Sequence, residues 1–411
     1  HCYNHWRDLG KQLNCSASEH MSETLANRIM DEVIASEVLS VCLTGGEPLT
    51  NYKVIKLILE RCKEVGIHAT MNSNATLLNE NNLHEIQELG LAGIFTSVLG
   101  SCPEIHDVIT GVVESFEKTI AGIRLCLQSA LWIDVNMVVN KKNFADILST
   151  AKMLESIGCS SMHIDTASCP VNCDDFSEFD LSHNEKIQAL RSIDNVNCNT
   201  RMLIGNSTRV PYCLIPQLSD QIKYFTSGCS AGTAHLVIGS NGECRACAKE
   251  IAMYKQSIRD SSLIDIWEDF SSWQTEERIP DECKECKLLY KCGGGCRFAG
   301  SSATGKINGC DPLMDKAGVE KALEMFGIYQ QDIQCHILPD AKINFSNFSI
   351  RNEEFGAVIW NGNAKQFVNE SGRLFLRNIV PGKSYLLGNN ISENYKEFLT
   401  DLVIGGFANV S

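Results

Sequence analysis

Short apolar segments alternate with amphipathic segments over the first 170 residues. Residues 38–43 form a β-branched apolar run, and residues 54–65 then place apolar side chains at helical spacing until Gly66. The later strand-like segments are 67–72, 93–98, 132–139 and 162–167, and the later helix-like segments are 83–89, 115–127 and 143–158. The pattern predicts five parallel strands covered by helices, a fold that gathers its chemistry at the carboxyl ends of the strands.

The pattern changes after residue 170. A looser polar stretch precedes a cysteine-rich block, and a helix-like segment at 316–327 leads to alternating strands at 348–379. An Asn361-Gly362-Asn363 turn predicts a hairpin there, and residues 394–407 read as a helix ended by glycines. We therefore expect four regions: an α/β core (1–185), a connecting region (186–212), a cysteine-rich domain (213–314) and a small α+β module (315–411).

Composition and charge exclude several classes of protein. The 411 residues are 44% hydrophobic and 21% charged, as in ordinary globular proteins. The net charge of -14 and the lack of a basic run argue against a nucleic acid partner. No apolar run reaches the roughly 18 residues of a membrane helix. With no visible signal peptide, we expect a cytoplasmic protein with no membrane partner.

The cysteines are the outlier, at 20 residues. Residues 283–296 read CKECKLLYKCGGGC, with the spacing C-x2-C-x5-C-x3-C. A C-x2-C pair lets two thiolates reach one metal centre, and the three glycines allow the backbone to bend around a cluster. The further thiols of the block are Cys213, Cys229, Cys247 and Cys310. Eight ligands suit two four-cysteine iron–sulfur clusters, while zinc and purely structural thiols stay open as alternatives.

The order C-x12-G-x4-C, C-x2-C-x5-C-x3-C and a last cysteine resembles the SPASM domain, which follows the radical S-adenosylmethionine (SAM) core in many peptide-modifying enzymes. The resemblance implies two auxiliary [4Fe-4S] clusters. It assigns Cys213, Cys229, Cys247 and Cys296 to auxiliary cluster I. It assigns Cys283, Cys286, Cys292 and Cys310 to auxiliary cluster II, with Cys244 as a competitor for Cys247 in cluster I.

The first residues resemble the end of another motif. Radical SAM enzymes carry C-x3-C-x-Φ-C after the first strand of a partial (β/α)6 barrel, and His1-Cys2 looks like its last two positions. The resemblance implies that Cys2 is the third ligand of a catalytic [4Fe-4S] cluster that also binds SAM. We expect the other two cysteines and the first barrel strand to lie upstream of His1, so that the sequence is a truncation.

Other loops of the core match the same family. Gly45-Gly46-Glu47-Pro48 follows a strand where the family meets the amino group of SAM, and Glu47 can accept a hydrogen bond from an ammonium. Ser73-Asn74-Ala75-Thr76 resembles the family's Thr-Asn-Gly-Thr, and Ser97 ends the next strand. Leu99 stands where the family often has an acid, so no base is assigned there. Residues 106–111 resemble a structural helix-entry stretch of SPASM enzymes.

Two further groups of cysteines need separate interpretations. Cys42, Cys62 and Cys126 occupy apolar positions, so we expect small core residues. Cys169 and Cys173 follow the last predicted strand, near the expected mouth of the active site. Either could act as a hydrogen donor or redox thiol, and they are the only catalytic candidates.

The last module resembles the small peptide-chaperone domain of pyrroloquinoline-quinone biosynthesis. Such a domain can add an extended leader peptide to a strand edge. A generic β-rich cap is the alternative.

Together these resemblances imply a radical SAM/SPASM enzyme that cleaves SAM to a 5′-deoxyadenosyl radical and abstracts hydrogen from a ribosomally made precursor peptide or a protein. They also imply an electron donor such as flavodoxin or ferredoxin. Two alternatives stay open. One is an anaerobic sulfatase-maturating or quinone-cofactor-type maturase, and the other is a non-catalytic iron–sulfur or peptide-binding fragment.

Overall fold

The computed structural model describes most of the chain. The described residues are 20–129, 131–168, 174–225, 228–250, 257–337, 341–353, 356–361, 365–387 and 393–410. The chain divides into two compact units, His1–Ala322 and Leu323–Ser411. The second unit therefore begins eight residues after the expected boundary at 315.

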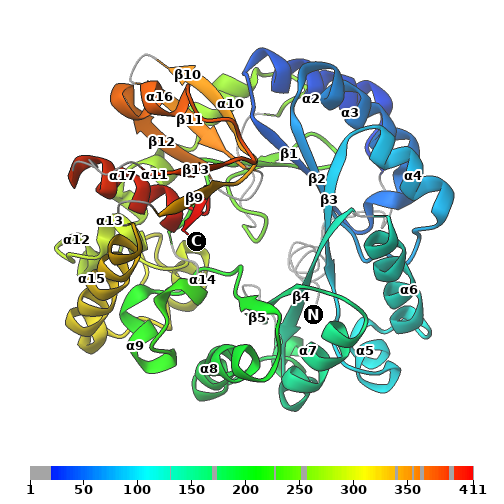
Figure 1. The fold of residues 1–411 in the computed structure, drawn as a ribbon. Coiled ribbons are helices and arrows are strands. Elements are labelled where there is room, and N and C mark those ends of the chain that lie inside the picture. The colour runs from blue at the N-terminus through cyan, green and yellow to red at the C-terminus, as the bar shows by residue number, and fades with distance from the viewer. Residues whose placement is uncertain are drawn as a thin grey trace. The chain divides into compact units, whose positions relative to one another are not determined.

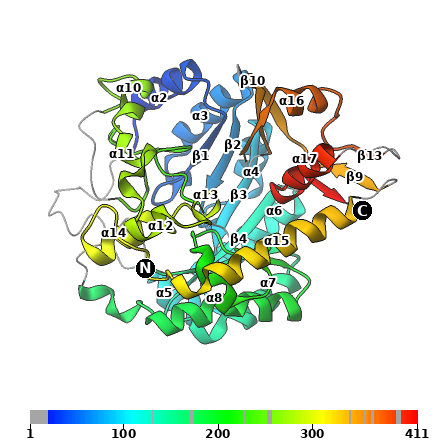
Figure 2. The same cartoon turned by 90° about the vertical axis from the view of Figure 1, so that its left-hand side faces the viewer.

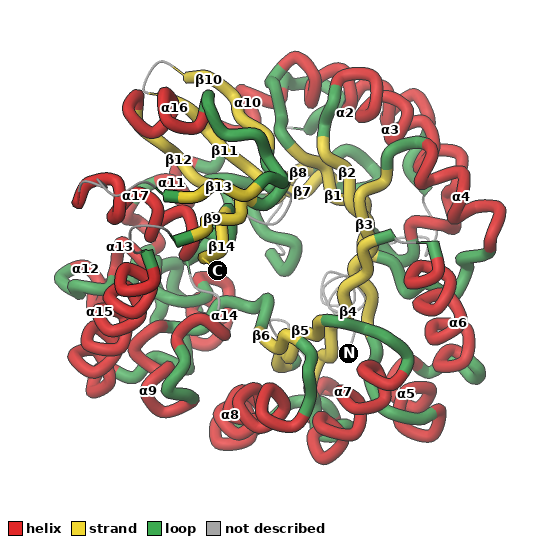
Figure 3. The backbone as a smooth tube through the Cα atoms, viewed as in Figure 1, coloured by secondary structure: helices red, strands yellow, loops and turns green. Residues whose placement is uncertain are grey.

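A six-stranded parallel sheet organises the first unit, with its strands in chain order from β1 to β6. The strands are β1 (Ser40–Leu43), β2 (His68–Asn72), β3 (Leu91–Ser97), β4 (Trp132–Val139), β5 (Ser161–Thr166) and β6 (Leu203–Gly205). The helices are α2 (Glu23–Ala35), α3 (Tyr52–Val65), α4 (Glu80–Glu88), α5 (Pro103–Thr110), α6 (Ser115–Gln128), α7 (Ile147–Ser156) and α8 (His183–Asn199). Figures 1 and 3 show the helices on the outer side of the curved sheet. The structure therefore has the α/β architecture of a partial barrel.

The two faces of the sheet differ in polarity because alternate side chains point to opposite sides. The outer face carries side chains with at most 1% exposure, which are Ala69, Met71, Ile94, Val135, Met137 and Ile164. These pack under the helices and form the core. The strand registers align Asn72 with Phe95, Phe95 with Asp134, and Asn136 with His163 on the inner face. The inner face is therefore the polar one, and it is where chemistry can take place.

The five strands predicted from the pattern are all present, within two residues of the expected bounds. The sheet does not end at the fifth strand, however, because β6 pairs in parallel with β5. The count of five strands was therefore wrong, and the core continues beyond residue 185 into the expected connecting region. The number of strands consequently no longer argues for a strand upstream of His1.

The cysteine-rich region is built from short elements. They include η4 (Tyr212–Leu214), α9 (Ile215–Leu218), β7 (Val237–Ile238), β8 (Cys244–Arg245), α10 (Leu263–Glu268), α11 (Ser271–Gln274), α12 (Asp281–Lys284), α13 (Leu289–Cys292) and α14 (Arg297–Thr304). Figure 2 shows α10 beside α2. There the Leu263 N–H donates to Glu32 at 2.8 Å, and Arg28 donates to the backbone oxygen of Ile258 at 3.3 Å. These contacts join the region to the parallel sheet and its helices.

Two three-stranded antiparallel sheets form the second unit. Their strand orders are β10-β11-β12 and β13-β9-β14. The bounds are β9 (Lys342–Phe345), β10 (Ser349–Glu353), β11 (Gly356–Trp360), β12 (Lys365–Asn369), β13 (Ser384–Leu386) and β14 (Ala408–Val410). The helices are α16 (Glu370–Leu376) and α17 (Glu393–Ile404), while α15 (Val319–His336) crosses the boundary between the units. Phe345, Ile359, Leu402 and Phe407 lie in one buried core.

The predicted hairpin in this unit is confirmed by the antiparallel pair β11 and β12, although residues 362–364 of its turn lie outside the described part of the chain. The helix ending at Gly405 is confirmed as α17. The prediction of strands over all of 348–379 was wrong at its end, because β12 stops at Asn369, which caps α16 by accepting from the Gly372 N–H. Among the described residues, no helix is long and apolar enough to cross a membrane.

Candidate functional site

Two of the loops predicted to bind SAM are joined by one carboxylate. Glu47 follows β1 and caps the short helix η1 (Pro48–Asn51) by accepting from the Leu49 N–H at 3.0 Å. From the loop after β2, the Ser73 hydroxyl donates to Glu47 at 2.8 Å and the Asn74 N–H donates at 2.8 Å. The predicted residues of both loops therefore lie together at the carboxyl edge of the sheet. Both Glu47 oxygens accept from within the protein, so the carboxylate also orders the loops.

The second loop contains a strained residue. Ala75, which stands where the family resemblance has glycine, adopts a left-handed φ of 61° and is fully buried. The Ser73 hydroxyl accepts from the Ala75 N–H at 3.0 Å, and Thr119 of α6 donates to the Asn74 oxygen at 3.0 Å. A Cβ on Gly122 would lie 2.3 Å from the Ala75 oxygen, so a glycine is needed for α6 to approach this loop. Packing therefore holds Ala75 in a conformation that alanine rarely adopts.

Ser97 lies at the carboxyl end of β3, paired in register with Asn136 of β4. It therefore shares the edge of the sheet with the loops that follow β1 and β2. The residues after it are structural: buried His106 accepts from the Leu99 N–H at 3.1 Å, and Asp107 accepts from the N–H groups of Glu114 and Phe116 at 2.7 and 2.8 Å. The structural interpretation of residues 106–111 agrees with these bonds.

The inner face of the sheet also holds an ion pair that the sequence analysis missed. His163 Nε2 lies 2.7 Å from the Asp134 carboxylate, which also accepts from the Ser161 hydroxyl at 2.8 Å. Phe95 packs edge-on against the His163 ring, with 5.4 Å between ring centroids. Burial lowers the pKa of His163, whereas the hydrogen bond to Asp134 and the charge of Asp134 raise it. The net effect is a raised pKa. The residues come from different strands, so sequence spacing gave no signal.

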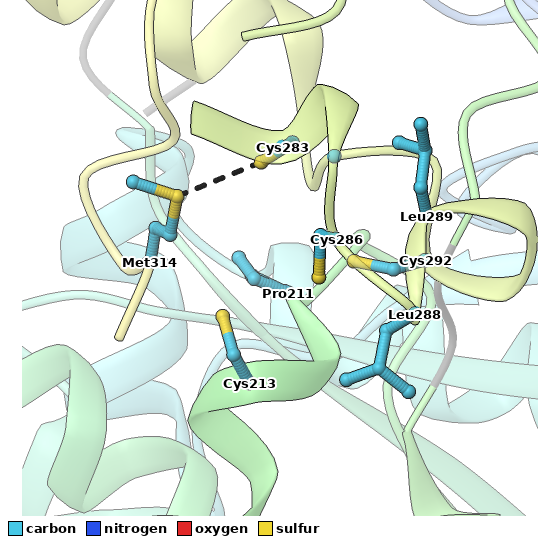
Figure 4. Close-up of a pocket in the computed structure, with 9 residues that line it drawn as sticks. Pro211, Cys213, Cys283, Cys286, Leu288, Leu289, Cys292 and Met314 are labelled. Carbon is cyan, nitrogen blue, oxygen red and sulfur yellow. Dashed lines mark hydrogen bonds between the residues drawn. The ribbon is translucent and has the colours of Figure 1, made fainter. Parts of the chain in front are cut away.

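Four cysteine thiols line one cavity in the cysteine-rich region. They come from η4 (Cys213), α12 (Cys283), the turn after α12 (Cys286) and the end of α13 (Cys292), and Met314 completes the wall. Figure 4 shows the four sulfur atoms around the cavity, with Cys283 at the top beside Met314, Cys213 at the lower left, and Cys286 and Cys292 next to each other in this view. Burial, with a smaller contribution from the neighbouring thiols, raises the pKa of Cys283 to about 12. A cluster binds the thiolate form, so cluster binding must release the proton of Cys283.

Three other thiols form a second group. Burial is the main cause that raises the pKa of Cys247 to about 11. The charges of Cys296 and Cys229 also raise this pKa, so the three thiols are neighbours. Buried Asp311 accepts from the Cys296 N–H at 2.7 Å, and Lys249 reaches Ser168, just after β5, at 3.2 Å. This group therefore lies close to the carboxyl end of the parallel sheet.

The remaining cysteines divide between confirmed and incorrect predictions. Cys62 and Cys126 are buried core residues, as expected. Cys42 is not, because it is exposed and donates to the Asn72 side chain at 3.4 Å. Cys42 pairs in register with Thr70 of β2, and the alternation along β1 turns it away from the core. Cys244 is fully buried on β8, with its thiol 3.7 Å from the Gly242 oxygen.

Three predicted residues lie outside the described part of the chain. These are Cys2, the expected third ligand of the catalytic cluster, and the thiol candidates Cys169 and Cys173. Their roles stay predictions.

The described thiols fit an iron–sulfur cluster. Soft thiolate ligands are those that iron–sulfur centres select, and four of them surround one cavity. Backbone donors also point at the sulfurs: the Tyr212 N–H lies 3.4 Å from Cys292 Sγ, and the Asp315 N–H lies 3.4 Å from Cys213 Sγ. Such N–H donors stabilise thiolate charge in clusters.

Comparisons with known proteins bear on both parts of the first unit. The radical SAM superfamily matches residues 1–154, and SPASM, described as an iron-sulfur cluster-binding domain, matches residues 229–287. An AdoMet-dependent heme synthase of Methanosarcina barkeri is 24% identical, over 68% of this chain and 83% of its own. A PqqA peptide cyclase of Rhizobium meliloti is 22% identical, over 75% of this chain and 82% of its own.

A solved structure agrees with the fold. The structure of anSMEcpe with bound AdoMet and Kp18Cys peptide covers 76% of this chain and 89% of its own, with 17% identity and a TM-score of 0.57. The described sheet, the four-thiol cavity and the two matched domains lead to one conclusion. Residues 1–154 form a radical SAM domain and residues 229–287 match the SPASM domain, so the chain is an enzyme whose cofactors are SAM and iron–sulfur clusters.

Proposed function

We propose that this enzyme modifies a peptide or protein that the ribosome has made. When bound, SAM and the reduced catalytic cluster supply a 5′-deoxyadenosyl radical, which removes hydrogen from the substrate. The proposal assigns SAM to the edge of the sheet formed by Gly45, Gly46, Glu47, Pro48, Ser73, Asn74 and Ser97. It assigns the catalytic cluster to Cys2 and to ligands supplied before it. The polar inner face would hold the reacting part of the substrate.

The observation that carries the peptide assignment is the second unit. In the sheet with the order β10-β11-β12, β10 and β12 are the outer strands, and Phe367 on β12 is 72% exposed. An outer strand with an exposed aromatic side chain can take up an extended peptide as an additional strand. The PqqA peptide cyclase relative and the peptide-bound structure of anSMEcpe support the same class of substrate.

A tetrapyrrole substrate is the second candidate. Relatives from Methanosarcina barkeri are an AdoMet-dependent heme synthase and an Fe-coproporphyrin III synthase, at 24% and 22% identity. Sulfatase maturation and quinone-cofactor assembly are variants of the first proposal, since both act on a protein or peptide. They differ in the substrate that must be supplied.

The test uses the natural full-length protein, reconstituted without oxygen and reduced by flavodoxin or ferredoxin as the proposed electron donor. Iron and 5′-deoxyadenosine are measured with precursor peptides encoded near the gene, a sulfatase peptide, or Fe-coproporphyrin III. We expect about twelve irons per chain, for three [4Fe–4S] clusters, and a mass change in a peptide. A product from the porphyrin alone would favour the second candidate. About eight irons without SAM cleavage would identify a non-catalytic iron–sulfur protein.

A further inference from the structure

The four-thiol cavity differs from the ligand set that the family resemblance implies. That resemblance places Cys310 with Cys283, Cys286 and Cys292, and places Cys213 with the other group. In the structure Cys213 lines the cavity with these three thiols, and Cys310 is absent from the cavity lining. We propose that Cys213, and not Cys310, is the fourth ligand of the auxiliary cluster held by Cys283, Cys286 and Cys292.

The backbone around Cys213 fixes its thiol at the cavity. Cys213 is buried in η4, two residues after Pro211, which also lines the cavity. A Cβ on Gly318 would lie 2.0 Å from the Cys213 oxygen, so the backbone of the following segment packs directly against this residue. The Asp315 N–H, from the same segment, donates to Cys213 Sγ at 3.4 Å. The sulfur is therefore both oriented and provided with a donor that favours its thiolate form.

Cys310 has a different partner. Its thiol donates to the Glu282 carboxylate at 3.0 Å, on an exposed part of the surface. This contact holds the Cys310 thiol on the Glu282 side chain, and Cys310 does not line the cavity. Cys310 nevertheless acts on Cys283 more strongly than Cys213 does, since the charges of both help to raise the pKa of Cys283 and that of Cys310 contributes more, so Cys310 is the competitor that a test must separate from Cys213.

The proposal has a consequence for the other auxiliary site. If Cys213 belongs to the four-thiol cavity, the second group of thiols retains Cys229, Cys247 and Cys296. Cys244 has another partner, because its thiol donates to the Gly242 oxygen at 3.7 Å. Among the described cysteines of the block, this leaves auxiliary cluster I with three thiolates from the second group, and with one iron free to take a different ligand.

The test isolates the cavity. Full-length protein carrying Cys2→Ala, Cys229→Ala, Cys247→Ala and Cys296→Ala keeps only this site, and it is reconstituted without oxygen. We expect about four irons per chain and a [4Fe–4S] Mössbauer spectrum. Adding Cys213→Ala should remove most of the iron or convert the cluster to a [3Fe–4S] form, and adding Cys310→Ala should leave both iron and spectrum unchanged. Cys283→Ala is the positive control for ligand loss.

A second arm protects against misfolding of the quadruple variant. Single Cys213→Ala and Cys310→Ala variants of the otherwise natural protein are compared by iron content and circular dichroism. We expect Cys310→Ala to retain full iron and Cys213→Ala to lose iron while keeping its helix content. Iron loss in Cys310→Ala, or no loss in Cys213→Ala, would overturn the proposal. These readouts need no substrate, so the assignment can fail while the peptide function holds, and the reverse is also possible.

Discussion

Among single residues of the inner face, His163 and Asp134 form a contact that determines the charge of a partly buried imidazole. Asp134 is 6% exposed, and its charge is balanced by His163 and by the hydroxyl of Ser161. The charge of Asp165 also raises the pKa of His163. The same carboxylate accepts hydrogen bonds from the backbone N–H groups of Ser207 and Thr208 at 2.9 and 2.7 Å. Two carboxylates therefore favour the charged form of this imidazole.

This pair predicts a pH dependence. The pKa of His163 is raised above its ordinary 6.5, so its contribution to stability is fully present below that pH and is lost as the pH rises through the raised value. Asp134→Asn should lower the pKa of His163, measured by NMR titration of the imidazole protons. His84, exposed on α4, is the control, and its imidazole signals should be the same in both proteins. An unaltered His163 pKa in Asp134→Asn would contradict the assigned cause.

Glu47 gives a second prediction for a single residue. Its carboxylate accepts from Leu49, Ser73 and Asn74, so Glu47→Ala leaves three donors without this partner. We expect a loss of about 1–3 kcal/mol in the free energy of unfolding. Chemical denaturation measures it, with Glu64→Ala on the exposed side of α3 as the control that should change stability little. Equal stabilities of the two variants would show that Glu47 does not order these loops.

Sequence could predict residues whose partners are close along the chain, and it missed those assembled across strands. The spacing of Cys283, Cys286 and Cys292 already placed these thiols together. Cys213 lies 70 residues before Cys283, and no spacing rule assigns it to one group rather than the other. His163 and Asp134 are 29 residues apart and meet only because β4 and β5 pair in a particular register.

At the scale of elements, the contact between α6 and the loop after β2 determines how closely a helix can approach the functional edge. Gly122→Ala would place a Cβ 2.3 Å from the Ala75 oxygen, and a backbone atom cannot move away easily. We expect destabilisation of about 1–3 kcal/mol, despite the better helix propensity of alanine. Thermal and chemical unfolding measure the change.

A matched substitution separates packing from propensity. Gly327 lies inside α15, and a Cβ there would meet nothing within 4 Å. Gly327→Ala should therefore stabilise the protein by up to about 1 kcal/mol, the usual gain of alanine over glycine in a helix. Destabilisation by both substitutions would mean that the close approach to Ala75 is not the cause at Gly122.

Elements with a strong period were predictable, and short or mixed ones were not. The long apolar strands β3, β4 and β5 stood out, since their outer faces are filled with aliphatic residues. β6 has three residues, one of them glycine, and its Leu203 is 77% exposed, so only pairing with β5 makes it a strand. Residues 370–376 alternate like a strand, but the Asn369 cap starts a helix. Local capping overrode the apolar pattern there.

At the scale of the whole molecule, the two parts of the first unit differ in what holds them together. The parallel sheet buries continuous aliphatic rows under seven long helices. Around the proposed clusters, α11, α12 and α13 have four residues each, and the sheet formed by β7 and β8 has two residues per strand. Elements this short contribute little stability of their own, so metal–thiolate bonds must supply much of the folding free energy in this region.

Removal of the metal should therefore act unevenly across the molecule. After anaerobic reconstitution, chelation of the iron should increase amide hydrogen exchange at 228–250 and 281–318, and leave β2 to β5 protected. The central strands keep their buried partners without metal, whereas the thiol segments lose their common anchor. Hydrogen exchange measured by mass spectrometry tests this, with residues 365–376 of the second unit as an internal control.

Uniform deprotection would mean that the clusters stabilise the sheet as well. Unchanged exchange near the cysteines would mean that side-chain packing, with Trp273 and Phe270 fully buried there, suffices to hold the region.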